Sequence, residues 1–268
     1  SGGTRLLRVA THGRSAYQAP LGAAQAVQVT VPNGGEAWPV GGSRSIQWSS
    51  TSLSGNVRVE LSRDGGGAYE TLFVSIPNDG SELWTVTGAP TANAVVRVVS
   101  VDNPGVRDSS DLAFSILQPT LAVMSPNGGD TLVTGSPTTI QWASTNLTGN
   151  VRIELSRNGG TSWPVLFVST PNDGSEAWTP TGPSTTQALV RVTSIDIPAL
   201  LDLSDSVFTI LQPALGVLTP NGGEEWAVGS TQTLQWSSQF VPGNVRIELS
   251  RDGGVTNQDV LIAHTVND

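Results

Sequence analysis

The sequence predicts an all-β protein built as a series of sandwich modules. Short runs of alternating apolar and polar residues lie between Gly, Pro, Asn and Asp turn signals, which is typical of strands in sandwiches. No window shows the apolar spacing of an amphipathic helix. One block of sequence also recurs, so that Trp48, Trp142 and Trp236 stand 94 residues apart.

The repeat divides the 268 residues into two complete modules and two partial pieces. Each copy opens on Pro-Asn-Gly-Gly, at 32–35, 126–129 and 220–223, and continues to a Gln-Trp pair. We predict a partial module at 1–26, complete modules at 27–118 and 121–212, and an incomplete third module at 215–268. The linker Gln118-Pro-Thr120 is short and contains proline, which predicts a stiff, rod-like array.

Seven strands are predicted in the first complete module, in this order: 27–31, 45–49, 56–62, 70–75, 83–86, 94–101 and 112–117. The strand at 56–62 is the clearest, because Val57, Val59 and Leu61 alternate with polar residues and predict one buried face. Gly-containing turns at 33–35, 63–66 and 78–80 separate the strands. The second module repeats every element, and the third stops before its last strands.

The motif series resembles a known family. It reads P-N-G-G-E-x-W, then V-R-I-E-L-S-R-D-G-G, P-N-D-G-S-x-x-W and S-D-x-x-F-x-I, and is similar to the Ser-Thr-rich, KRE/KNH-like immunoglobulin-type module. The resemblance covers 27–268, most completely 27–212, and Leu132 departs from the Trp of the other copies. It implies tandem immunoglobulin/fibronectin-III-like sandwiches, extracellular or at the cell surface, without catalytic residues of their own.

Composition argues against several classes of function. The net charge is −9 and no basic cluster is present, so nucleic acid is not an expected partner. No apolar run approaches the ~20 residues that a membrane span needs. The chain has no cysteine, which excludes a disulfide scaffold and a thiolate metal site.

Catalytic and metal-binding signals are sparse. The two histidines, His12 and His264, lie in the two partial pieces and do not recur, so we expect no enzyme and no resident cofactor. Calcium is the one metal considered, because carboxylate oxygens near a module junction could bind it. The alternative is that these side chains form local turns. The candidate calcium ligands are Asp102, Asp108, Asp111, Asp196, Asp202 and Asp205.

The tryptophans and the paired charges have two interpretations each. Trp48, Trp142, Trp236, Trp84 and Trp178 lie among apolar strand positions and are expected in cores. Trp38, Trp163 and Trp226 are open between core packing and a sugar-binding platform. Arg97 and Arg191 are expected to pair across strands with Glu60 and Glu154, unless this is an ordinary solvated face.

The two partial pieces suggest an assembly. Residues 6–11 resemble the sixth strand of a complete module, which the third module lacks. We therefore predict a head-to-tail homopolymer, in which the N-terminal segment of one copy completes the third module of the next by strand donation. In it Leu6, Leu7 and Val9 enter beside the strand of Val245, Ile247 and Leu249, and Arg8 meets Glu248.

Two alternatives stay open at this point. The ragged ends also suit a window cut from a longer tandem array. The alternative from another class is the non-catalytic accessory region of a larger secreted hydrolase, with extracellular or cell-wall glycan as a partner.

Overall fold

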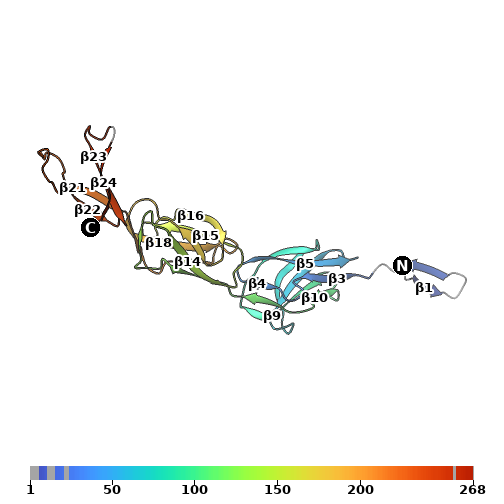
Figure 1. Cartoon of the computed structure of the whole chain (residues 1–268). Helices are drawn as coiled ribbons and strands as arrows, with labels where there is room; N and C mark the ends of the chain where they lie inside the picture. Colours follow the sequence, from blue (N-terminus) through green and yellow to red (C-terminus); the bar gives the residue numbers. More distant parts are fainter. Residues whose placement is uncertain (1–5, 11–15, 21–23, 256–257, 268) are drawn as a thin grey trace. The chain divides into compact units, whose positions relative to one another are not determined.

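The computed structural model describes residues 6–10, 16–20, 24–255 and 258–267, with side chains described for 24–255 and 259–267. In these residues the secondary structure consists of β-strands, and no helix is found among them (Figure 1). The predicted all-β class is therefore confirmed.

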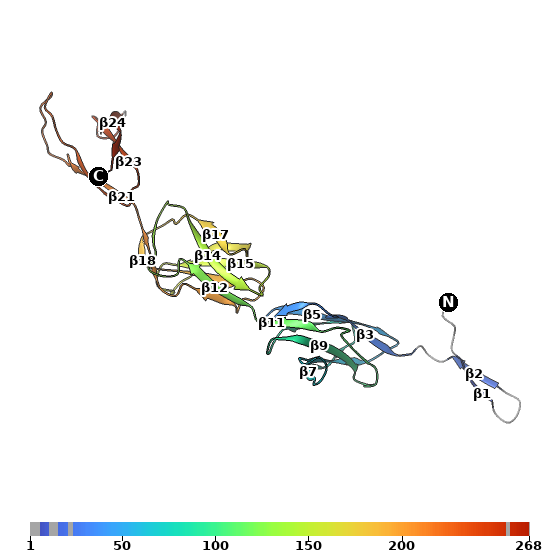
Figure 2. The same cartoon turned by 60° about the horizontal axis from the view of Figure 1, so that its bottom comes forward.

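Module 1 is a sandwich of two sheets (Figure 2). One sheet has the order β3-β5-β8, and the other has the order β4-β11-β9-β6-β7, with β10 also paired to β9. This is the arrangement of immunoglobulin/fibronectin-III-like sandwiches. The strands are β3 (Ala26–Val31), β4 (Ala37–Pro39), β5 (Ser43–Thr51), β6 (Asn56–Ser62), β7 (Glu70–Pro77), β8 (Ser81–Thr85), β9 (Thr91–Ser100), β10 (Arg107–Ser109) and β11 (Phe114–Leu117).

Module 2 repeats this topology, with sheets β12-β14-β17 and β13-β20-β18-β15-β16 and with β19 on β18. Its strands are β12 (Thr120–Ser125), β13 (Thr131–Val133), β14 (Thr138–Thr145), β15 (Asn150–Ser156), β16 (Val165–Pro171), β17 (Ser175–Trp178), β18 (Thr185–Ser194), β19 (Leu201–Leu203) and β20 (Phe208–Leu211).

The strand predictions for module 1 agree best where alternation is longest. The strand predicted at 56–62 is β6 with the same bounds. The sequence missed β4 and β10, because three residues are too few to show a period. The predicted last strand began at Leu112, which is 70% exposed, whereas β11 begins at Phe114.

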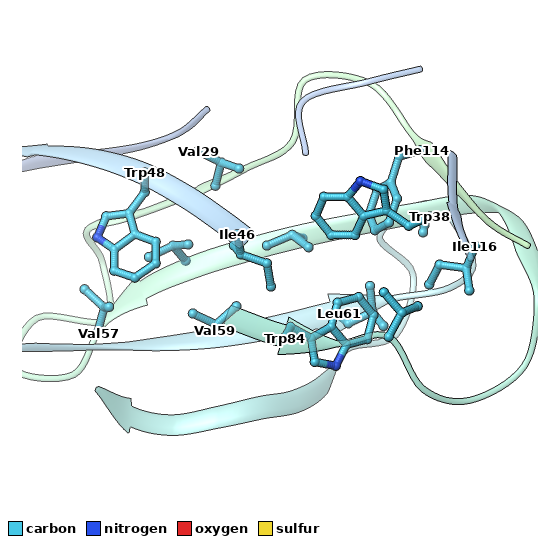
Figure 3. Packing of buried hydrophobic residues seen from close by; sticks show 14 of the residues in the cluster. Val29, Trp38, Ile46, Trp48, Val57, Val59, Leu61, Trp84, Phe114 and Ile116 are labelled. Atoms are coloured by element: carbon cyan, nitrogen blue, oxygen red, sulfur yellow. The ribbon is translucent and has the colours of Figure 1, made fainter. Parts of the chain in front are cut away.

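The core of module 1 lies between its two sheets and has an aromatic cluster near one end. Trp38 packs against Trp84 and Phe114, with ring centroids 6.2 and 5.0 Å apart, and Trp48 lies apart from them (Figure 3). Trp38, which the sequence left open, is therefore a core residue. Of the five tryptophans expected in cores, Trp48, Trp84, Trp142 and Trp178 are buried, whereas Trp236 is only partly buried.

Two smaller pieces flank the modules. The N-terminal hairpin pairs β1 (Leu6–Ala10) with β2 (Ala16–Pro20), and β2 was not predicted. The C-terminal half-module contains β21 (Ala214–Thr219), β22 (Gln235–Gln239), β23 (Asn244–Ser250) and β24 (Gln258–Val266), which pair as β21-β22 and β23-β24. These four strands correspond to β3, β5, β6 and β7. No described residue from 214 to 267 forms a counterpart of β8, β9 or β11.

Candidate assembly site

The C-terminal half-module exposes apolar side chains whose counterparts in module 1 are buried. Val217 is 60% exposed, whereas Val29 at the same place in β3 is 1% exposed. Trp226 is 40% exposed, whereas Trp38 is 5% exposed. Between the two hairpins lies a cavity of about 550 Å³, lined mainly by Leu215, Val217, Trp226, Trp236, Val245, Ile247 and Leu249.

A side-chain bridge joins the two hairpins of the half-module. The indole Nε1 of Trp236 donates to Asn267 Oδ1 at 3.0 Å, and Asn267 Nδ2 donates to the carbonyl of Val241 at 2.8 Å. The same Trp-to-Asn bond of 2.8 Å joins Trp48 to Asn78 in module 1. The half-module thus retains the bridge of a complete module while its apolar face is open.

A buried carboxylate marks the middle of β6 in module 1. Glu60 accepts from Arg58 on its own strand at 2.8 Å and from Arg97 on β9 at 2.6 Å. The predicted cross-strand pair is therefore present, but the solvated-face alternative is wrong, because the Glu60 side chain is only 9% exposed. The Arg97 guanidinium lies 3.5 Å from the ring centroid of Tyr69, which helps to cover the group.

Module 2 contains the same group on β15 and β18. Glu154 is bonded to Arg152 at 2.7 Å and to Arg191 at 2.6 Å. Trp163 takes the place of Tyr69, with its ring centroid 4.4 Å from Arg191. Trp163, which the sequence left open, therefore stacks on an arginine.

The described residues of the half-module contain one arginine of this group. Glu248 pairs with Arg246 on its own strand, and the Glu248 side chain is 31% exposed. No described residue of the half-module corresponds to Arg97. Arg251 also has fewer partners than its counterpart. It pairs with Asp259, whereas Arg63 in module 1 pairs with Glu70 and also donates to two backbone carbonyls that follow β8.

The proposed calcium ligands have structural contacts. Asp108 accepts from the backbone N–H of Val29 at 2.8 Å, and Asp111 exchanges two 2.7 Å bonds with the side chain of Asn33. Asp202 and Asp205 make the corresponding contacts in module 2. Asp102 and Asp196 lie against Gly55 and Gly149. No group of three or more acidic or histidine side chains in the described part of the chain is placed to hold a metal ion.

The Asn-Gly-Gly turn of module 1 is held by a carboxylate. Glu36 accepts from the backbone N–H groups of Asn33 and Gly34, each at 2.8 Å. Partial burial raises the pKa of Glu36, but hydrogen bonds from the backbone N–H groups of Asn33, Glu36 and Gly34 outweigh it and lower the pKa overall.

The predicted assembly residues fall into two groups. Val245, Ile247, Glu248 and Leu249 lie on β23 and line the cavity. Leu6, Leu7, Arg8 and Val9 lie on β1, and their side chains are outside the described ones. His12 is outside the described residues, and His264 lies on β24.

Comparisons with known proteins identify no family. No family model matches the sequence, and no curated protein matches it either. The solved structures that resemble the chain include the fibronectin(III)-like modules of Clostridium thermocellum CbhA, with 14% identity, 69% of this chain and 94% of that chain covered, and a TM-score of 0.31.

Two further similar structures also have tandem domains. The chicken CNTN1 FN1–FN3 domains share 14% identity over 79% of this chain and 83% of theirs, with a TM-score of 0.27. A tetra-tandem repeat in the extending region of a large adhesion protein shares 17% identity over 91% of this chain and 63% of its own length, with a TM-score of 0.28. The strand topology described above carries the fold assignment. Within the residues described, no helix has the length and apolarity that crossing a membrane requires.

Proposed function

We propose that the chain is an extracellular or cell-surface protein with a structural or adhesive role, and that it assembles head to tail with copies of itself. The observation that carries the proposal is the open apolar face of the half-module, with its cavity of about 550 Å³. Such a face favours pairing with another strand, and one edge of β23 beside it is unpaired among the described residues. The occupant we propose is the N-terminal hairpin of a second copy.

The register of module 1 specifies how the hairpin would pair. In module 1, β9 lies beside β6 with Arg97 opposite Glu60. Placing β1 beside β23 in this register sets Arg8 opposite Glu248. Leu7 and Val9 then take the positions of Val96 and Val98, which are fully buried. The second strand of the hairpin, β2, then takes the place of β10. Gln18 is opposite Arg8 in the hairpin, just as Ser109 of β10 is opposite Arg97 in module 1.

The charge on Glu248 supports this choice of occupant. A strand without a basic residue at that position would bury the carboxylate with a single arginine, which is costly. Arg8 would supply the second arginine that Glu60 and Glu154 already have. The contact joins two different surfaces and does not close on itself, so repetition builds a filament.

Electron microscopy and sedimentation of the purified chain test the proposal. We expect filaments from the unmodified chain, no filaments from Glu248→Arg, and filaments again when Glu248→Arg is combined with Arg8→Glu. The matched control is Glu225→Arg, an exposed change of the same charge in the same half-module, which should leave assembly intact. A chain that stays monomeric at high concentration, or a charge swap that restores nothing, would contradict the proposal.

The exposure of Trp226 favours a second candidate, a glycan-binding accessory region of a larger secreted hydrolase. An exposed indole beside an apolar cavity can stack on a sugar ring. Binding to cell-wall polysaccharide that is lost in Trp226→Ala, together with a catalytic domain in the parent reading frame, would favour this candidate over the filament.

A further inference from the structure

The second strand of module 1, β4, is bonded directly to its last strand, β11. β4 and β11 pair in parallel, whereas the other described strand pairs of the module are antiparallel. Further backbone bonds extend this pairing at its two ends. Gly35 donates to Ala113 at 3.2 Å, Ser115 donates to Glu36 at 2.8 Å, and Val40 donates to Leu117 at 2.9 Å.

Module 2 contains the same pairing between β13 and β20, also parallel. Its extending bonds are equivalent: Gly129 to Val207 at 3.2 Å, Thr209 to Asp130 at 2.9 Å, and Thr134 to Leu211 at 2.8 Å. The half-module lacks this pairing within its described residues, and a Cβ added at Gly222 would meet no atom within 4 Å.

The chain enters and leaves module 1 at opposite ends. At one end Ala26 pairs with Thr51, and at the other Leu117 is bonded to Val40, close to the start of β5 at Ser43. Tension along the chain therefore pulls β4 toward one end and β11 toward the other. Because the two strands are parallel, their hydrogen bonds are loaded along the strand direction and must break together. Detachment of β3 alone leaves β4 still bonded to β11.

We propose that modules 1 and 2 are tension-bearing units, and that the parallel β4–β11 and β13–β20 pairings are the elements that resist the load. Tension that enters through β3 reaches β4 and crosses the β4–β11 bonds to the last strand of the module. The inference holds whether or not the chain assembles into filaments, because it rests on the two complete modules alone.

The packing behind the pairing differs between the modules. In module 1 Trp38 on β4 and Ile116 on β11 are opposite each other in the pairing, and both side chains are buried in the core (Figure 3). In module 2 the smaller Leu132 stands in place of Trp38 and is partly exposed. We therefore expect module 1 to resist a given load longer than module 2.

Single-molecule pulling of the full chain tests the inference. Because the chain has no cysteine, handles can be attached to cysteines introduced at Ala24 and Leu215, so that the load crosses both complete modules. We expect two unfolding events, each releasing about 30 nm of chain. Val40→Pro removes the N–H that bonds Leu117 and should raise the rate of one event about tenfold at fixed load, with the other unchanged.

Two controls separate this element from general stability. Asn78→Ala breaks the Trp48 bridge but leaves β4 and β11 untouched, so the unfolding rate under load should stay within about threefold. In the unmodified module, handles at Ala24 and Asp79 lie at the same end and should peel strands at a lower force. Equal effects of Val40→Pro and Asn78→Ala, or equal forces in both pulling directions, would overturn the inference.

Discussion

The substitution Asn78→Ala tests the internal bridge of module 1. Asn78 Oδ1 accepts from the indole N–H of Trp48 at 2.8 Å. Asn78 Nδ2 donates to the hydroxyl of Ser50 at 3.0 Å and to the carbonyl of Leu53 at 3.1 Å. The side chain thus ties β5 and the loop after it to the turn that precedes β8.

The burial of Trp48 determines how much stability Asn78→Ala should cost. This residue is only 4% exposed, and removal of the amide leaves its indole N–H without its partner. A buried unsatisfied donor costs about 1–3 kcal/mol, and the bond to the Leu53 carbonyl adds about 1 kcal/mol. The bond to Ser50 lies in solvent and adds little. We expect the free energy of unfolding of module 1 to fall by about 2–4 kcal/mol.

A double-mutant cycle with Trp48→Phe isolates the bond. The phenyl ring carries no donor, so Asn78→Ala should cost about 1–2 kcal/mol less in the Trp48→Phe background than in the unmodified chain. Native-state hydrogen exchange of the β5 and β6 amides measures these changes for module 1 within the full chain. Asp79→Ala, the exposed neighbour, is the matched control and should change stability by less than about 0.5 kcal/mol. Additive losses within about 0.5 kcal/mol would refute the reasoning.

Two further predictions concern the Asn-Gly-Gly turn of module 1. The same hydrogen-exchange measurement gives the stability of module 1, with module 2 as the internal reference. Gly34→Ala should lower the free energy of unfolding clearly more than Gly35→Ala. Both glycines have positive φ, but only a Cβ at Gly34 meets another atom, Leu112 Cβ at 2.5 Å. Equal losses of stability in the two variants would rule out the clash. The pKa of Glu36 lies below its ordinary value near 4.5, so its contribution is present above pH 4.5 and is lost as the pH falls through the folded value. Glu36→Gln should therefore lower stability at neutral pH and flatten its decline below pH 4.5, and an unchanged decline would contradict this.

Much of the fold could be predicted from local pattern. Alternation in β6 showed both the strand and its inward face, because a period of two directly determines which side chains share a side. The pairing of Arg97 with Glu60 could also be predicted, since the two strands are neighbours in sandwiches of this kind. The burial of Glu60 could not, because it depends on Arg58 pairing with the carboxylate and on Tyr69 stacking on Arg97.

Some features of the candidate site could also be predicted from the sequence, and others could not. The incomplete set of strands at 214–267 could be counted in the sequence, and so could the missing counterpart of Arg97. The cavity could not, because it depends on how far apart the Trp236–Asn267 bridge holds the two hairpins. The hairpin partner β2 was missed because its five residues show little alternation, and its backbone pairing with β1 defines it.

The sequence by itself determined the repeat, seven of the nine strands of module 1 and most of the core, since alternation, turn residues and recurrence are local properties of the chain. Only the tertiary structure decided that β4 meets β11 edge to edge. The three-residue strand β4 carries no periodic signal, and its parallel contact with β11 joins residues about 78 positions apart. Long-range hydrogen bonds of this kind depend on the closed sandwich, and they turn two short segments into the element proposed to carry load.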